Sequence, residues 1–197
     1  TIGHVSGCHM NPAVTLAMLF TRKIELVKSG LYIVTQCISA ITAIAVLKAM
    51  TPDKSQGGYG VIKIVDGMSE LQGFGIEFVS TFILLFTIFS VSDENRNDIQ
   101  GSTPLAIGLC IVTLIFFGAP LTGAALNPAR ALGPAVVMGL YDNQWVYWVG
   151  PIGGAITAAA VYEHIFRNLR PEEIEAAEIA KQLKLRETEA SASSPPV

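Results

Sequence analysis

Two short stretches of this sequence place an asparagine and a proline where a helix would begin. Residues 6–14 and 122–130 each read hydroxyl residue, glycine, two further residues, an apolar residue and then Asn-Pro-Ala, with Asn11 and Asn127 standing 116 positions apart. Asparagine is among the best helix N-caps, and proline suits the first helical position. A helix start carries partial positive charge and unsatisfied N–H groups, and the asparagine amides add hydrogen-bond donors. The chemistry indicated is donation of hydrogen bonds in a positive field.

The apolar runs that follow the two motifs are too short to cross a bilayer. They cover residues 14–20 and 131–138, whereas a spanning helix needs about 20 mostly apolar residues. We therefore predict two half-spans. Paired short hydrophobic segments with glycine and proline interruptions are typical of an inverted repeat whose site lies near the middle of the membrane.

The composition indicates that membrane-spanning helices hold these half-spans. Hydrophobic residues make up 51% of the chain, charged residues make up 15%, and the mean hydropathy is +0.48, which is too apolar for an ordinary soluble domain. The sequence has no basic patch with interleaved aromatic residues, so a nucleic-acid partner is not indicated. Four segments are long and apolar enough to be membrane-spanning helices: Leu31–Met50, Gly73–Val91, Pro104–Leu121 and Trp145–Phe166.

Basic residues flank the first and last predicted spans, which places both flanks in the cytoplasm. These residues are Arg22, Lys23, Lys28, Arg167 and Arg170. Residues 171–197 change from glutamate-rich to serine- and proline-rich sequence and indicate a solvated, partly disordered cytoplasmic tail. A helix from Pro171 to about Thr188 is predicted there, and a regulatory binding segment is the alternative to a tail without chemistry.

The doubled Asn-Pro-Ala, with Arg130 directly after the second copy, resembles the signature of the aquaporin (major intrinsic protein) family. The resemblance runs from about Gly3 to Arg167. It implies an all-α membrane protein, a right-handed helical bundle in which two re-entrant half-helices meet tip to tip among six full spans. Because four spans are predicted here, the resemblance implies a fragment whose first two spans, with one pore-lining aromatic, precede Thr1. We expect a channel domain over residues 1–170, followed by the tail.

The resemblance also assigns roles to individual residues. The two pore motifs are Asn11, Pro12, Ala13, Asn127, Pro128 and Ala129. The outer selectivity filter would contain Arg130, Ile115 and Ala124, while Glu77 and Gln36 would brace the re-entrant loops and His9 would help to form the inner vestibule. In this family the two amides orient a passing water by its oxygen, and the positive field excludes protons and cations.

Several positions bear on which solute passes. Water-selective members carry a histidine where this chain has Ile115, and the loss of that polar wall lowers the cost of passing a carbon skeleton such as glycerol. Glycerol facilitators carry an aspartate where this chain has Ala131, and Tyr147–Trp148 is similar to the aromatic pair of water-type members. The chain most resembles insect-like members of the water-type branch. Ala124 stands where mercury-sensitive members have cysteine, which predicts weak mercurial block.

Most of these residues have a plainer alternative. Arg130 could be a snorkelling arginine, although an arginine after a half-helix start at the membrane midplane reaches water only through a pore. For Glu77, an intramembrane carboxyl, proton transfer is the alternative to bracing. Ile115 would face a neighbouring helix after a one-residue shift in register. Gly150 and Gly154 indicate close helix packing rather than a ligand site.

These patterns together predict a passive plasma-membrane channel for water, with glycerol- or urea-like solutes passing as well and with protons and ions excluded. The resemblance implies a homotetramer with one pore per subunit, surrounded by lipid. His4, Cys8 and His9 have no carboxylate or second cysteine beside them, so no metal site or cofactor is expected. The rival classes are a junctional or adhesive member with little water flux, an ion-conducting member and, least favoured, an enzyme.

Overall fold

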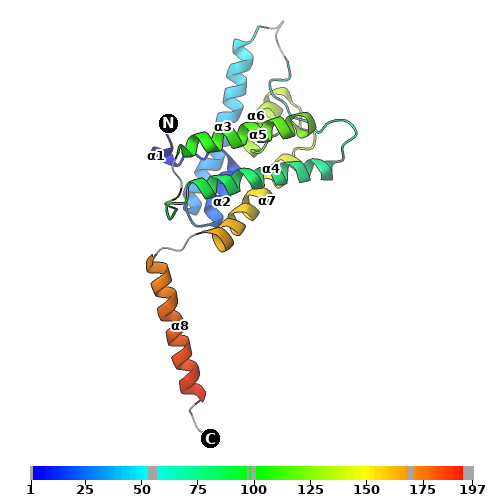
Figure 1. Ribbon diagram of the computed structural model, residues 1–197. Coiled ribbons are helices and arrows are strands. Elements are labelled where there is room, and N and C mark those ends of the chain that lie inside the picture. Colours follow the sequence, from blue (N-terminus) through cyan, green and yellow to red (C-terminus); the bar gives the residue numbers. More distant parts are fainter. Residues whose placement is uncertain (1, 53–56, 97, 99–100, 168–170, 193–197) are drawn as a thin grey trace.

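The computed structural model of the chain describes residues 2–52, 57–96, 98, 101–167 and 171–192. Over these residues the protein is helical and has no strand (Figure 1). The helices are α1 (Gly3–Ser6), α2 (Pro12–Phe20), α3 (Leu26–Met50), α4 (Glu70–Val91), α5 (Thr103–Thr122), α6 (Pro128–Met138), α7 (Val146–Val161), the π-helix η2 (Tyr162–Phe166) and α8 (Pro171–Ala192). The predicted all-α class is confirmed. The short α1 was not predicted.

Three of the described helices, α3, α4 and α5, are long and apolar enough to cross a membrane. Each contains one predicted span and begins one to five residues before it. In α4 the earlier start has a clear cause, because the Ser69 hydroxyl accepts the Gln72 N–H at 3.3 Å while the Gln72 side chain accepts the Ser69 N–H at 2.9 Å. This reciprocal capping box satisfies two N–H groups that the helix leaves without partners.

The fourth predicted span consists of two kinds of helix. α7 continues directly into η2, where the Arg167 N–H donates to the carbonyl of Tyr162, five residues back, at 2.9 Å. The Tyr162 hydroxyl donates to Asp93 Oδ2 at 2.8 Å and so ties this segment to the end of α4. An apolar run does not distinguish an α-helix from a π-helix, so the sequence pattern gave no sign of the change.

α2 and α6 are the two predicted half-helices, with nine and eleven residues. Asn11 is the N-cap of α2 and Pro12 is its first residue; Asn127 and Pro128 take the same places in α6. The predicted helix starts are therefore confirmed. Neither helix has the length of about 20 residues that a bilayer requires.

The bundle packs around close contacts between α4 and α7, and α3 packs against α6 on the other side (Figure 1). A Cβ atom on Gly154 would lie 2.1 Å from the Phe78 carbonyl oxygen, and one on Gly150 would lie 2.9 Å from Glu77 Cβ. Only glycine permits this approach of the two backbones. The prediction that these glycines serve packing is confirmed, and the packing places Glu77 inside the protein.

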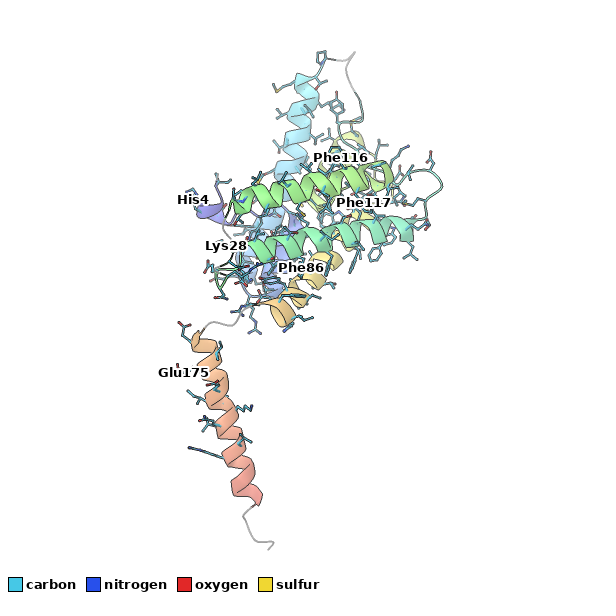
Figure 2. The ribbon with its side chains drawn as sticks, in the orientation of Figure 1. His4, Lys28, Phe86, Phe116, Phe117 and Glu175 are labelled. Atoms are coloured by element: carbon cyan, nitrogen blue, oxygen red, sulfur yellow. The ribbon has the colours of Figure 1, made fainter. Side chains whose placement is uncertain are left out.

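The outer faces of the bundle are apolar. On α5, Phe116 is 80% exposed and Phe117 is 51% exposed, as is expected of side chains that face lipid or a neighbouring helix (Figure 2). α8 projects away from the bundle, with Glu175 near its start (Figure 2). It extends the predicted tail helix by four residues, and residues 193–197 of the predicted tail lie outside the described residues.

Candidate functional site

The two Asn-Pro-Ala motifs cap their half-helices in the same way. Asn11 Oδ1 accepts the Ala13 N–H at 2.9 Å, and Asn127 Oδ1 accepts the Ala129 N–H at 3.0 Å and the Arg130 N–H at 3.3 Å. These bonds fix each amide plane with its oxygen toward the helix. The NH₂ group of each asparagine is thereby turned away from its own helix.

Each of these NH₂ groups donates to the other motif. Asn11 Nδ2 donates to the Leu126 carbonyl at 2.8 Å, and Asn127 Nδ2 donates to the Met10 carbonyl at 2.9 Å. The two half-helices therefore meet N-terminus to N-terminus, and their dipoles place partial positive charge at the junction. An amide NH₂ group has two hydrogens and each crossing bond uses one, which leaves a second hydrogen for a small acceptor.

The sequence repeat is also a repeat of backbone conformation. Three pairs of residues, each pair 116 positions apart, have similar left-handed φ angles. The pairs are Gly7 and Gly123 (73° and 84°), Cys8 and Ala124 (both 49°), and Met10 and Leu126 (50° and 55°). Positive φ is uncommon outside glycine and gathers at functional sites, where the surroundings must hold it in place. The two loops therefore need strong anchors.

Glu77 contacts the loop that leads into the second motif. Its carboxylate is fully buried and accepts three hydrogen bonds: from the Thr122 hydroxyl at 2.6 Å, the Ala125 N–H at 2.9 Å and the Leu126 N–H at 2.8 Å. Both carboxylate oxygens accept from donors, and an ionised carboxylate can pair with all of them because it only accepts hydrogen bonds. This geometry suits a brace, because a group that moved protons would have to release these donors.

Gln36 reaches the first half-helix through an intermediate hydroxyl. Gln36 Nε2 donates to Thr15 Oγ1 at 3.0 Å, and the Thr15 hydroxyl lies 3.1 Å from the Asn11 carbonyl and 3.3 Å from His9 Nδ1. The His9 ring in turn packs edge-on against Tyr32, with the ring centres 5.6 Å apart. Sequence reasoning missed Thr15; a hydroxyl one turn after the N-cap, on a helix otherwise apolar, was the available signal.

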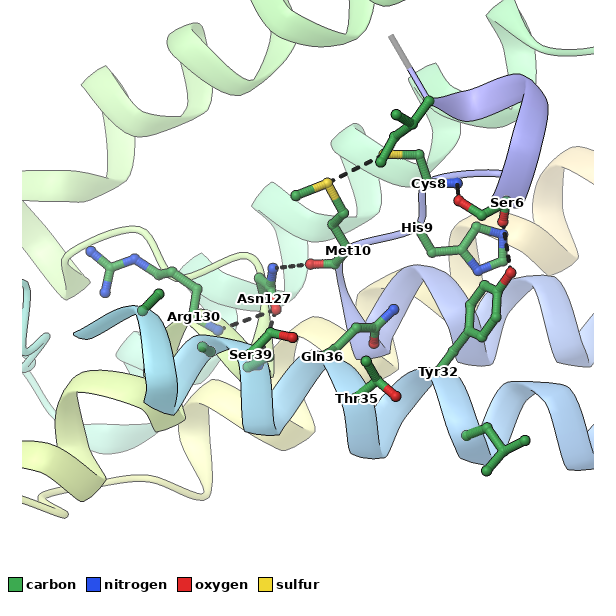
Figure 3. Close-up of a pocket in the computed structure, with 15 residues that line it drawn as sticks. Ser6, Cys8, His9, Met10, Tyr32, Thr35, Gln36, Ser39, Asn127 and Arg130 are labelled. Carbon is green, nitrogen blue, oxygen red and sulfur yellow. Dashed lines mark hydrogen bonds between the residues drawn. The ribbon is translucent and has the colours of Figure 1, made fainter. Parts of the chain in front are cut away.

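A groove of about 650 Å³ runs between α3 and the two motif loops (Figure 3). Five predicted site residues line it and so share one space: His9, Gln36, Asn127, Ala129 and Arg130. Arg130 lies in the first turn of α6, and its Nη1 donates to the Gly60 carbonyl at 2.8 Å. This bond holds one end of the guanidinium, which has five N–H donors in all.

The comparison with known proteins agrees with this architecture. The family model described as Major intrinsic protein matches residues 1–162. The chain belongs to the major intrinsic protein family. This member of the family is 48% identical to aquaporin-4 of Rattus norvegicus over 164 residues. The matched region covers 83% of this chain and 51% of the relative. Its identity to aquaporin-1 of Homo sapiens is 38% over 165 residues, and this match covers 84% of this chain and 61% of the relative.

A solved structure shares the fold of this major intrinsic protein. The X-ray structure of the aquaglyceroporin from Plasmodium falciparum matches with a TM-score of 0.70 at 25% identity and covers 83% of this chain and 74% of that one. The chain spans about half the length of the aquaporin-4 relatives that it matches. Its assignment to the insect-like branch stays a prediction.

Two predicted filter residues of this major intrinsic protein do not line the groove. Ile115 lies on α5 and is 44% exposed, whereas Ala124 is 6% exposed and packs near Gly118 in the core. Their roles in a filter stay predictions. The described part of the chain contains no group of three or more histidine, cysteine or acidic residues placed to hold a metal ion.

Proposed function

We propose that the full-length protein containing this chain is a passive membrane channel for water and small uncharged solutes. The observation that carries the proposal is the junction of α2 and α6, where Asn11 and Asn127 each donate across to the other motif. The family membership and the names of the relatives, aquaporin-4 and aquaporin-1, support it. No enzymatic activity, cofactor or nucleic-acid partner is proposed.

The proposed mechanism uses the second amide hydrogen of each asparagine. A water whose oxygen accepts from both Asn11 and Asn127 turns its hydrogens toward its neighbours in opposite directions, which interrupts a chain of hydrogen bonds along which protons would move. The two helix N-termini repel hydronium and other cations. Arg130 adds a permanent charge and donors on the outer side. Neutral molecules that accept hydrogen bonds pass, whereas cations meet a positive field.

We further propose that two more spans close the groove between α3 and the motif loops. Those spans would shield the half-helices, since an unsatisfied polar group facing lipid costs several kcal/mol. Residues 1–170 would then be part of a channel domain in a plasma-membrane homotetramer, with residues 171–197 as a cytoplasmic tail. His9 would line the inner vestibule, and Gln36 and Glu77 would brace the two loops.

Swelling assays test this function. Cells that express the full-length protein are expected to swell rapidly in dilute medium without added electrical conductance, whereas residues 1–197 alone are expected to conduct no water. Normal surface expression without fast swelling would favour a junctional or adhesive role, and an added ionic current would favour an ion channel. Either result would overturn the proposal.

Ile115 is the position expected to decide which solute passes. If Ile115 lines the outer constriction, its side chain gives the carbon skeleton of glycerol an apolar contact. The hydroxyl groups of glycerol would then form hydrogen bonds on the side of Arg130. Ile115→His would leave polar groups poorly paired, at about 1–3 kcal/mol, and is expected to reduce glycerol flux about tenfold or more while water flux persists. Parallel uptake of water and radiolabelled glycerol measures this. An unchanged glycerol-to-water ratio would show that Ile115 faces elsewhere.

A further inference from the structure

The far end of the first half-helix is held by a side chain that the pore motif does not include. The chain leaves α2 through Arg22, which has a left-handed φ of 58°, and the Lys23 N–H donates back to the Met18 carbonyl at 2.8 Å. This turn follows the end of the helix and directs the Lys23 side chain toward α4 and η2.

Lys23 contacts two elements at once. Its ammonium lies 4.4 Å from the centre of the Phe89 ring, at the end of α4, and forms an ion pair with Glu163 in η2. Phe89 is buried, and the Glu163 side chain is only 14% exposed. Glu163 also pairs with Arg167 at 3.5 Å, but those two residues are only four positions apart in the chain. Lys23 is therefore the side chain that ties α2 to both α4 and η2 by charge.

The second half-helix ends with the same kind of backbone turn but without an ion pair. α6 stops at Gly139, with φ of 68°, and the Leu140 N–H donates to the Ala135 carbonyl. Neither half-helix has a basic residue in its last turn, and none of the ion pairs found among the described residues involves α6. The repeat is thus symmetric at the asparagines and in the closing turns, and asymmetric in the ion pair that follows α2.

We propose that Lys23 is a positioning residue for the pore: its contacts with Phe89 and Glu163 set the axial position of α2 and so the position of the Asn11 amide at the opposite end. A helix of nine residues is about 14 Å long and moves as a unit, so a shift at one end reaches the other. The proposal rests on the channel function proposed above, since it concerns the geometry of that channel's amide donors.

The test uses the full-length protein with paired substitutions. Lys23→Met keeps an apolar stem over Phe89 and removes the charge, and Glu163→Gln removes the partner. Arg167→Met is the matched control, because it removes the other cation that pairs with Glu163 and leaves the Lys23 contacts in place. The measurements are water permeability at several temperatures, the urea-to-water permeability ratio, and amide hydrogen exchange in α2. The temperature dependence and the ratio are independent of the number of channels in the membrane.

Lys23→Met and Glu163→Gln are each expected to lower water permeability per channel roughly two- to fivefold, the range over which a partly exposed ion pair shifts an equilibrium. Both should steepen its temperature dependence and speed exchange in α2, while Arg167→Met changes neither. Lys23→Arg should restore the wild-type values. Wild-type temperature dependence, solute ratio and exchange in both variants would overturn the positioning role. A wild type that conducts no water would instead overturn the channel function, and α2 exchange would still test the contact.

Discussion

Replacing Arg130 with valine is expected to admit cations and protons while leaving water flux largely intact. Arg130 lines the groove, as Asn127 does, and its guanidinium donates to the Gly60 carbonyl. Two unit charges 4 Å apart repel by about 1 kcal/mol in water and about 4 kcal/mol at an effective dielectric constant of 20. Loss of the charge should therefore raise cation permeability between roughly fivefold and a thousandfold, whereas a neutral molecule feels no such repulsion.

Voltage-clamp recording with swelling measurements on the same cells checks this expectation. Arg130→Lys is the matched control, because it keeps the charge and changes the shape and the number of donors. Its cation permeability should stay near that of the wild type. If Arg130→Val showed no added conductance at normal surface expression, Arg130 would not be the charge that excludes cations.

Glu77→Gln is expected to have a comparably large effect on the loop before the second motif. The carboxylate accepts from Thr122, Ala125 and Leu126. Glutamine has one acceptor oxygen and one NH₂ group, so at least one of these donors would face another donor. A buried donor without a partner costs about 1–3 kcal/mol, which lowers the population of the correctly formed loop roughly five- to hundredfold. Water flux per channel and thermal stability in detergent should both fall.

Glu70→Gln is the control on the same helix. Glu70 is exposed at the start of α4, where its carboxylate accepts from Trp145 Nε1 at 2.7 Å. An exposed hydrogen bond of this kind contributes little, because water replaces either partner. Flux and stability should therefore stay near wild type. Equal losses in the two variants would show that any charge change on α4 disturbs the protein.

Local chemistry made parts of this protein predictable from sequence. Asn11–Pro12 and Asn127–Pro128 specify helix starts through capping and a fixed proline φ, and the structure begins α2 and α6 there. The long apolar runs likewise predicted α3, α4 and α5, because lipid imposes a minimum length on a spanning helix. The five predicted site residues that line the groove were recognised by resemblance to the family.

Contacts between distant segments were not predictable in this way. Nothing in the neighbourhood of Lys23 indicates that it would meet Phe89 and Glu163, since that meeting depends on how α2 lies against α7 and how α7 lies against α4. Thr15 links Gln36 to the first half-helix for the same reason. The left-handed φ of Met10 was also hidden, because outside glycine a residue's identity says little about αL conformation.

The crossed amide bonds have a consequence for how the chain is made. They join residues 115 and 117 positions apart, so neither motif can satisfy its donors until the other has been synthesised. At roughly 5–20 residues per second, the first half-loop leaves the ribosome about 6 to 23 s before its partner. During that interval the polar groups of the first half-loop need water, the translocon or a chaperone as a substitute. Assembly of the junction is therefore a late, long-range step, of the kind that loop-closure entropy makes slow.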